Sequence, residues 1–340
     1  MNNLRKQQEV NWSRFKKIGI AFPLLTLSQY AFSTPTTLPE VPTMINIQHT
    51  AVAGDSLTKA FGANCEANTS WLDLLCLLKA DQPHHSWFDG ESQRVNSIHD
   101  RFKSQDSSIT AYRGAATTGA ELTGIREDGE EPSFAAQAMM IVSQSLKPNH
   151  VEVLFGGNDL CSRDCIDPAH CDDPLYTEDE WRDALRNGLN TLVSHLPQGA
   201  SILLGSVPRV QDIRQAGLAK QADNHRVNCE SIWQTFNVCR IVTQSTPLNG
   251  ESLTYRHQAI AEMQQRYNEI LVEEARAYNE NSNGLNPTGV EVIAEYVDEQ
   301  TPSGGTFSFG GEHINGGDCF HPNLNTQNII ADFMWHANPH

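Results

Sequence analysis

The sequence predicts an α/β fold in which a mostly parallel sheet of about five strands carries helices on both faces. Two observations predict this class. Short apolar segments of strand length recur along the chain, and longer segments between them have apolar residues at the three- and four-residue spacing of a helix. Strands that alternate with helices form βαβ units, which build parallel sheets. A chain of 340 residues is long enough for one large core of this kind.

The predicted strands are short, and three of them run directly into glycine-flanked polar residues. They cover residues 45–53, 107–112, 150–155, 200–207 and 290–297. The first three end at Gly54-Asp55-Ser56, Arg113-Gly114 and Gly156-Gly157-Asn158-Asp159. Ligands of open parallel sheets bind beyond the carboxyl ends of the strands. We therefore expect Ser56, Gly114 and Asn158 to meet at one edge of the sheet.

Four longer segments have the periodicity of helices with one apolar face. They cover residues 133–146, 178–196, 252–278 and 325–336. In the third of these, Ile260, Met263, Tyr267, Ile270 and Leu271 form a single stripe. Spacing of this kind predicts helices that pack against the sheet.

The first 33 residues have the pattern of a secretory signal peptide. Five basic residues precede an apolar run from Ile18 to Leu27, and Ala31-Phe32-Ser33 fits the small-x-small cleavage rule. The alternative is a membrane anchor, but the run contains Pro23 and is too short to span about 30 Å of hydrocarbon. Prolines in residues 34–44 indicate an extended leader before one domain over residues 45–340. We expect a secreted or periplasmic protein without stable membrane insertion.

The net charge of −17 argues against nucleic-acid partners. Without residues 1–33 the chain keeps 19 basic and 40 acidic residues, a net charge of −21. A field of that sign repels phosphates. A saline habitat and ordinary solubility both explain the acidity, and the oligomeric state stays open.

Eight cysteines in a chain that carries an export signal predict disulfides. Cys65 with Cys76 and Cys229 with Cys239 are close in sequence and are expected to pair. The partners of four others stay open, namely Cys161, Cys165, Cys171 and Cys319. A zinc site is the alternative, but its thiolates would have to be kept reduced, which an exported chain does not favour.

Ser56 is the candidate nucleophile. A serine that follows a strand and a glycine is usually a turn residue or a helix cap. At a strand-to-helix junction, however, the turn also exposes the hydroxyl at the sheet edge and directs helix N–H groups toward it. A serine hydroxyl needs a neighbouring base to become a nucleophile.

His321 is the candidate base. It lies in Gly316-Gly317-Asp318-Cys319-Phe320-His321-Pro322, where Asp318 precedes it by three residues. One loop can therefore hold the carboxylate against the imidazole, fix its tautomer and stabilise the imidazolium. His313 is the nearest rival, but it lacks an acid at a matching distance in sequence.

Attack on an ester carbonyl builds negative charge on its oxygen, so the site also needs hydrogen-bond donors. The N–H groups of Ser56 and Gly114 and the side-chain amide of Asn158 are the expected oxyanion donors. Gly119 is the alternative to Gly114, which we prefer because it follows the strand directly.

Four segments together resemble the blocks of the GDSL/SGNH hydrolase family, in the same chain order. They are Gly54-Asp55-Ser56-Leu57, the glycine of Tyr112-Arg113-Gly114-Ala115, Gly156-Gly157-Asn158-Asp159, and Asp318-Cys319-Phe320-His321. The third and fourth look particularly like the phospholipase B-like branch. The resemblance covers residues from about 46 to 337. It implies a three-layer α/β/α sandwich, no metal or organic cofactor, and the roles given above.

We therefore expect a secreted serine hydrolase that cleaves carboxylic esters, including (lyso)phospholipids, through an acyl-enzyme on Ser56. Trp87 and Asp159 are predicted to contact the substrate, although a tryptophan in such a place is more often part of the core. The alternatives are a short-chain or carbohydrate O-acetyl esterase, a non-catalytic secreted binding domain, and a zinc-dependent amidase. The expected partner is a small-molecule or lipid ester.

Overall fold

The computed structural model describes residues 46–65, 76, 80–124, 131–294 and 307–338. The predicted signal peptide and leader, residues 1–44, lie outside the described residues. All the described helices and strands belong to one compact unit, residues 44–340.

The core of this unit is a parallel sheet of five strands in the order β2-β1-β3-β4-β5. The strands are β1 (His49–Gly54), β2 (Thr110–Tyr112), β3 (His150–Leu154), β4 (Ser201–Leu204) and β5 (Glu291–Ala294). Each adjacent pair is parallel. The predicted α/β class and strand number are confirmed, with each strand shorter than its apolar segment.

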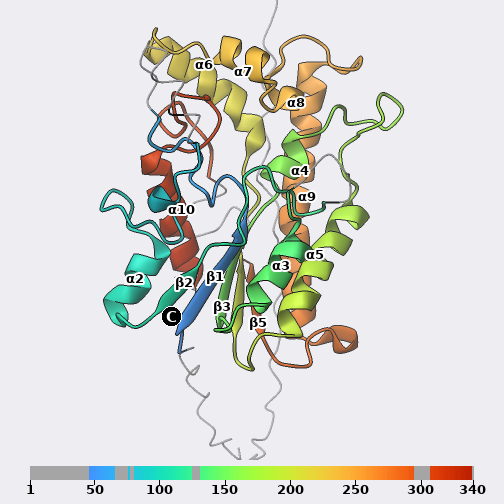
Figure 1. Ribbon diagram of the computed structural model, residues 1–340. Coiled ribbons are helices and arrows are strands. Elements are labelled where there is room, and N and C mark those ends of the chain that lie inside the picture. Colours follow the sequence, from blue (N-terminus) through green and yellow to red (C-terminus); the bar gives the residue numbers. More distant parts are fainter. Residues whose placement is uncertain (1–45, 66–75, 77–79, 125–130, 295–306, 339–340) are drawn as a thin grey trace, which may run out of the picture. The chain divides into compact units, whose positions relative to one another are not determined.

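Alternate residues of each strand enter two separate cores. Ala51 and Ala53 of β1 pack on the side of α3 (Phe134–Val142), α5 (Glu178–Val193) and α9 (Leu253–Asn279). Val52 packs on the other side, with α2 (Ile98–Gln105) and α10 (Leu324–Ala337). Figure 1 shows the two groups of helices on either side of the strands. The result is the predicted three-layer sandwich.

The predicted helices begin at side-chain caps. Thr177 forms a capping box with Glu180 at the start of α5, and Ser252 accepts a hydrogen bond from the N–H of Tyr255 at the start of α9. Such caps satisfy N–H groups that have no partner inside the helix. Gly188 of α5 allows close packing on α3, because a Cβ there would lie 2.1 Å from the ring of Phe134.

Several short helices were not predicted from the sequence. They are α2, α4 (Gly157–Cys161), α6 (Ile213–Asp223), α7 (Cys229–Phe236), α8 (Arg240–Thr243), and three 3-10 turns, η1 (Pro83–His85), η2 (Val210–Asp212) and η3 (Ser282–Gly284). Figure 1 shows α6, α7 and α8 together beyond the carboxyl ends of the strands. We refer to α6, α7 and α8 together as the cap. The cap lies at the end of the sheet where the sequence predicts the site.

All eight cysteines form disulfides, and one predicted pair is wrong. Cys65 pairs with Cys76 as expected. Cys229 pairs with Cys319, and Cys239 pairs with Cys161. The fourth bridge joins Cys165 to Cys171. Cys229 begins α7 and Cys239 follows its end, so the rise of about 1.5 Å per residue separates them by more than the roughly 7 Å that a disulfide spans.

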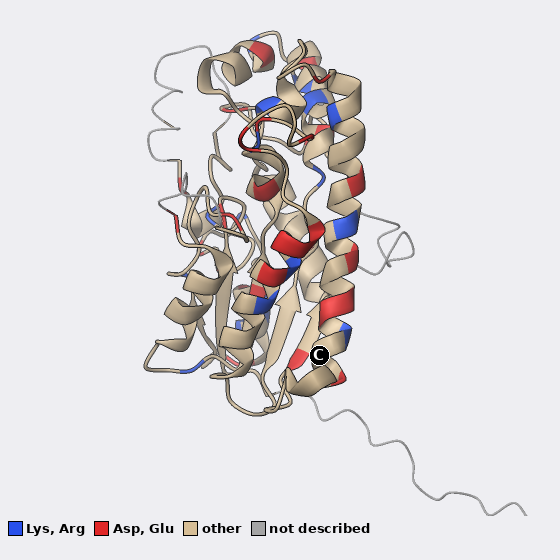
Figure 2. Cartoon of the chain, turned by 90° about the vertical axis from the view of Figure 1, so that its right-hand side faces the viewer, with Lys and Arg blue, Asp and Glu red and all other residues tan. Residues whose placement is uncertain are grey.

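The charges on the α5 and α9 side are mixed in sign. Figure 2 shows both acidic and basic residues along the helices on this side of the molecule. Among the described residues, no helix combines the length and apolar character needed to cross a membrane.

Candidate active site

Ser56 lies two residues beyond β1, in a turn that Gly54 and Gln137 hold in place. The side chain of Gln137, which is fully buried in α3, accepts from the N–H of Gly54 at 2.9 Å and donates to its carbonyl at 3.0 Å. A Cβ on Gly54 would lie 2.3 Å from Oγ1 of Thr58. The N–H of Phe61 then donates to the carbonyl of Ser56 at 3.0 Å. The turn therefore has little freedom, and it leaves Ser56 4% exposed.

The second segment of the site is the loop that carries Asp318 and His321. Oδ1 of Asp318 accepts the N–H groups of Phe320 and His321, which curls the loop around the carboxylate. Cys319 has a φ of +56°, a conformation that few residues other than glycine adopt. Oδ2 of Asp318 lies 2.6 Å from Nδ1 of His321. A separation of three residues thus brings acid and imidazole together, as the spacing predicts.

The imidazole of His321 contacts Ser56 directly. Its Nε2 lies 2.8 Å from Oγ of Ser56, although the two residues are 265 positions apart in the sequence. The ring packs against Phe61, with 4.5 Å between centroids. Because the carboxylate can only accept, Nδ1 carries the proton and Nε2 is free to accept the serine proton. The arrangement has the geometry of a nucleophile, a base and an acid that orients the base.

Contacts with Asn315 and with α7 fix this loop. Asn315 accepts from the N–H groups of Gly317 and Asp318 through its Oδ1, and its own N–H donates to the carbonyl of His321. Nε1 of Trp233, from α7, donates to the carbonyl of Cys319 at 3.2 Å. The Cys229–Cys319 disulfide joins the same two segments covalently. A loop without regular secondary structure is thereby anchored to the cap.

The third segment begins at Gly156, whose φ of +103° allows β3 to turn into α4. A side chain at this position would be strained, and its Cβ would lie 2.7 Å from Val207. Asn158 follows in the first turn of α4. Its Nδ2 donates to the carbonyl of Ala120 at 2.9 Å, which uses one of two amide hydrogens. The other is available to a substrate oxygen.

The side-chain amide of Asn158 donates to the carbonyl of Ala120, the residue after Gly119. Tyr112 pairs with Ala51 at the end of the register between β1 and β2, and Gly114 follows two residues later, outside the paired strand. The chain then continues to Thr117, whose N–H donates to the carbonyl of Gly54 at 3.0 Å. Hydrogen bonds thus join the segment 117–120, which contains Gly119, to Gly54 and to Asn158.

The two residues predicted to contact substrate, Trp87 and Asp159, are both fully buried. Trp87 packs in the core between the sheet and α10. The carboxylate of Asp159 accepts the N–H groups of Leu122 and Thr123 at 2.9 and 3.1 Å. Trp87 is therefore a core residue. The two hydrogen bonds of Asp159 hold the loop beside Asn158 in place.

Three carboxyl groups near Ser56 have shifted pKa values. Burial raises the pKa of Asp55 to about 7, against the lowering effects of the Leu57 N–H and of His321. Burial also raises the pKa of Asp159. Burial acts in the same direction on Asp318, but the charge of His321 and hydrogen bonds from the loop outweigh it and lower the pKa of this carboxyl. Asp318 is therefore ionised at neutral pH, as a partner of an imidazolium must be.

A small pocket opens at Ser56. The lining residues from the three catalytic segments are Asp55, Ser56, Leu57, Gly157, Asn158, Phe320 and Pro322. The cap and its neighbours add Pro208, Val210, Ile213 and Phe309. Asp55, Trp233 and the cap residues were not identified from the sequence as parts of the site. The position of Asp55 in the Gly-Asp-Ser motif, next to Ser56, could have indicated that it belongs to the site. Within the described part of the chain, no group of three or more His, Cys, Asp or Glu side chains is arranged to hold a metal ion.

The fold and the Ser–His–Asp contacts define the class of a serine hydrolase. The chain belongs to the GDSL-like lipase/acylhydrolase family, whose sequence profile matches residues 51–334. No curated protein sequence matches the chain.

Three solved structures with a similar chain path are distant from this chain in sequence. A family two carbohydrate esterase from Clostridium thermocellum is 12% identical, with a TM-score of 0.41 over 86% of this chain. This chain spans only 63% of that esterase. An extracellular lipase from Streptomyces rimosus is 12% identical, with a TM-score of 0.40 over 86% of this chain and 100% of the lipase. Est24, a carbohydrate acetylesterase from Sinorhizobium meliloti, is 12% identical, with a TM-score of 0.41 over 84% and 94% of the two chains.

Proposed function

We propose that the protein hydrolyses carboxylic esters through an acyl-enzyme formed on Ser56. The observation that carries the proposal is the continuous contact from Asp318 through His321 to Oγ of Ser56, with distances of 2.6 and 2.8 Å. Membership of the GDSL-like lipase/acylhydrolase family supports the same reaction class.

In the proposed mechanism Nε2 of His321 takes the proton of Ser56 as Oγ attacks the ester carbonyl carbon. Asp318, ionised because its pKa is lowered, stabilises the imidazolium that results. The imidazolium then gives its proton to the alcohol oxygen, and the ester C–O bond breaks. A water molecule repeats the sequence on the acyl-enzyme and releases the acid.

The proposed oxyanion donors are the N–H of Ser56, the second amide hydrogen of Asn158 and the N–H of Gly114. Gly119 is the alternative to Gly114, supported by the hydrogen bonds that join the segment 117–120 to Gly54 and to Asn158. Asp159 supports the donors indirectly, because its carboxylate holds Leu122 and Thr123 in the same loop. Loss of one direct donor typically costs about 3–4 kcal/mol of transition-state stabilisation.

We propose an exported location, secreted or periplasmic. Four disulfides in the described residues support it, because such bonds persist in oxidising compartments. The sequence blocks favour the phospholipase B-like branch and hence (lyso)phospholipid esters. The small pocket at Ser56 favours instead the short-chain esterase alternative.

The test of the proposed activity is covalent labelling of the full chain by a fluorophosphonate, followed by peptide mapping. We expect one modified residue, Ser56, no labelling of Ser56→Ala, and loss of p-nitrophenyl acetate hydrolysis in the same variant. Folded wild-type protein that takes no label would show a non-catalytic binding domain instead.

A further inference from the structure

We propose that the pocket at Ser56 binds the acyl group of the ester, and that Ile213 and Phe309 restrict it to short, uncharged chains. This inference rests on the proposed function and names the substrate class of that site. It assigns a role in specificity to the cap, which contains neither nucleophile nor base.

The wall of the pocket comes from the cap and from the segment before the base loop. Pro208 and Val210 precede α6, Ile213 begins it, and Phe309 lies just before the loop of His321. All four side chains are apolar. Such a wall is favourable for a hydrocarbon chain, which is transferred from water as it binds.

The position of the pocket fits the acyl part of the ester rather than the alcohol. Its lining includes Ser56 and Asn158, the groups expected around the carbonyl carbon and oxygen. The imidazole of His321 does not line it. The leaving alcohol must lie against the imidazole that protonates it, so the alcohol occupies the other side of the carbonyl.

The pocket is too small for a long chain. Its cavity volume is about 20 Å³, which is room for little more than a water molecule. Ile213 closes one side and is itself 3% exposed, packed in a cluster with Trp233 and Cys319. Phe309 is held by its N–H, which donates to Oδ2 of Asp212 at 3.3 Å. An acetyl group therefore requires little movement of the wall, and an octanoyl chain requires much more.

The charges around the pocket exclude acidic acyl groups. No lysine or arginine is among the lining residues that the structure describes. Asp55 lines the same cavity, and its Oδ2 is buried without a hydrogen-bond partner. A carboxylate or phosphate on the acyl chain would lose its hydration there and gain no cation in exchange.

The experiment measures kcat/KM of the full chain on p-nitrophenyl esters from acetate to decanoate. For the wild type we expect at least about a tenfold lower value for octanoate than for acetate or butyrate, since single methylenes in a fitted pocket are worth about 10- to 200-fold. Ile213→Ala and Phe309→Ala should each raise the octanoate-to-acetate ratio by about tenfold.

Two further variants sharpen the result. Gly157→Ala adds a methyl group 3.3 Å from Cγ of Pro208 and 3.9 Å from Oδ2 of Asp55, so it should lower the ratio of butyrate to acetate. Ile232→Ala removes the same atoms as Ile213→Ala from the same cluster, but Ile232 does not line the pocket. This matched control should leave the chain-length profile unchanged.

A wild type that prefers octanoate or longer esters would overturn the inference, as would an unchanged ratio in both Ile213→Ala and Phe309→Ala. Either outcome leaves the proposed hydrolase intact if Ser56 is still labelled by fluorophosphonate. If Ser56 takes no label, the proposed function fails first. Should one of the alanine variants not fold, the other and the wild-type profile decide.

Discussion

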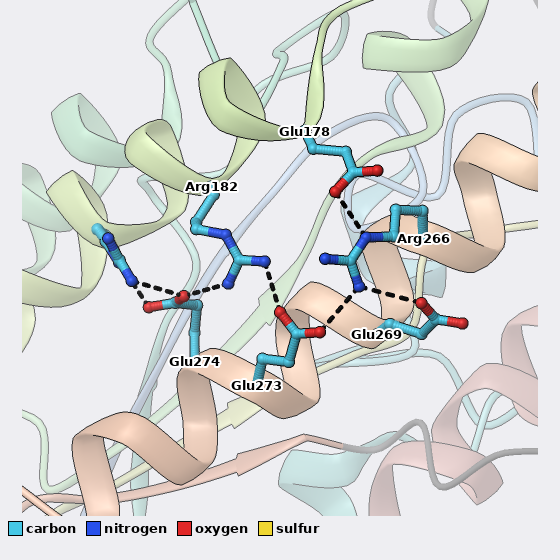
Figure 3. A network of polar contacts seen from close by, with 7 residues as sticks. Glu178, Arg182, Arg266, Glu269, Glu273 and Glu274 are labelled. Atoms are coloured by element: carbon cyan, nitrogen blue, oxygen red, sulfur yellow. Dashed lines mark hydrogen bonds and ion pairs between the residues drawn. The ribbon is translucent and has the colours of Figure 1, made fainter. Parts of the chain in front are cut away.

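Two regions of this protein are held together by different means. On one flank of the sheet, α5 and α9 are joined by a network of ion pairs, shown in Figure 3. At the carboxyl end of the sheet, the cap and the candidate catalytic segments are joined by disulfides. The flank consists of long helices that bury a continuous face, whereas the site consists of loops and helices of one or two turns.

The flank network shares its charges among several partners. Arg266 contacts Glu178, Glu269 and Glu273, and Arg182 contacts Glu273 and Glu274. The side chain of Glu274 is 1% exposed, and Arg186 is its second partner. Most of the other side chains are partly exposed, which weakens their attraction through solvent screening.

The disulfides of the site converge on α7. Cys229, at its first residue, joins the loop of His321 through Cys319. Cys239, just after it, joins α4 through Cys161, three residues beyond Asn158. One short helix thus anchors both the candidate base and a candidate oxyanion donor. We therefore expect the flank contacts to serve stability alone and the cap contacts also to set the geometry of the site.

The largest expected effect is that of removing the candidate base. His321→Ala should reduce kcat by about 10⁴-fold or more, because no other described group reaches Oγ of Ser56 to accept its proton. The melting temperature should change little, since the imidazole is not in the core. Steady-state kinetics and thermal unfolding on the same sample check both parts. If kcat fell by less than about tenfold, another group would have to be the base.

The next largest effect is expected from the bridge between α7 and the base loop. Replacing Cys229 and Cys319 together by alanine removes a cross-link over 90 residues, which is worth about 4–5 kcal/mol in the chain-entropy model. We also expect lower kcat at temperatures where the variant is fully folded, because the loop of His321 loses an anchor.

The matched control is the double alanine variant of Cys165 and Cys171, a bridge over 6 residues. Its expected cost is about 2 kcal/mol, without a change in kcat. Equal kcat losses in the two folded variants would show that α7 has no special part in positioning the site.

The same contrast explains which parts of the fold the sequence could predict. Long segments such as α9 and buried runs such as β3 show their period directly. The helices α4, α7 and α8 span too few turns to show one, and short helices depend on tertiary contacts for their stability. The pairing of Cys229 depended on α7, so it was mispredicted for the same reason.

For the site, motif positions were predictable but side-chain directions were not. Ser56, Asp318 and His321 lie in segments whose spacing already indicates their chemistry, and the structure brings their side chains within hydrogen-bonding distance. Asn158 and Asp159 are neighbours in one helical turn, yet one faces the pocket and the other a buried loop. That difference follows from how α4 packs, which no local pattern in the sequence specifies.

The two regions also differ in the partners of their buried carboxylates. Glu274 on the flank is paired with two arginines, whereas Oδ2 of Asp55 at the site has no partner. Burial raises the pKa of Asp55 from 3.8 to about 7. Between these values the folded protein binds more protons than the unfolded chain, so the contribution of Asp55 to stability falls as pH rises.

Asp55→Asn should therefore stabilise the protein relative to wild type at pH 8, by up to about 4 kcal/mol, and the difference should shrink toward pH 4. Denaturant unfolding across this range measures it. Asp106→Asn is a control of opposite sign, because hydrogen bonds from Ser108 lower the pKa of Asp106. A pH-independent difference for Asp55→Asn would show that its carboxyl group titrates normally.

The smallest effect is expected on the flank, at Arg266. Arg266→Ala breaks three ion pairs, yet its partners Glu178, Glu269 and Glu273 are 43–49% exposed and can be hydrated instead. We expect a loss of about 1 kcal/mol or less in the free energy of unfolding, reduced further by high salt, and unchanged kcat. Arg182→Ala is the matched comparison and should cost more, because it removes a partner from the buried carboxylate of Glu274. If Arg266→Ala lowered kcat while the protein stayed folded, the flank would be coupled to the site, and the division between stabilising ion pairs and positioning disulfides would not hold.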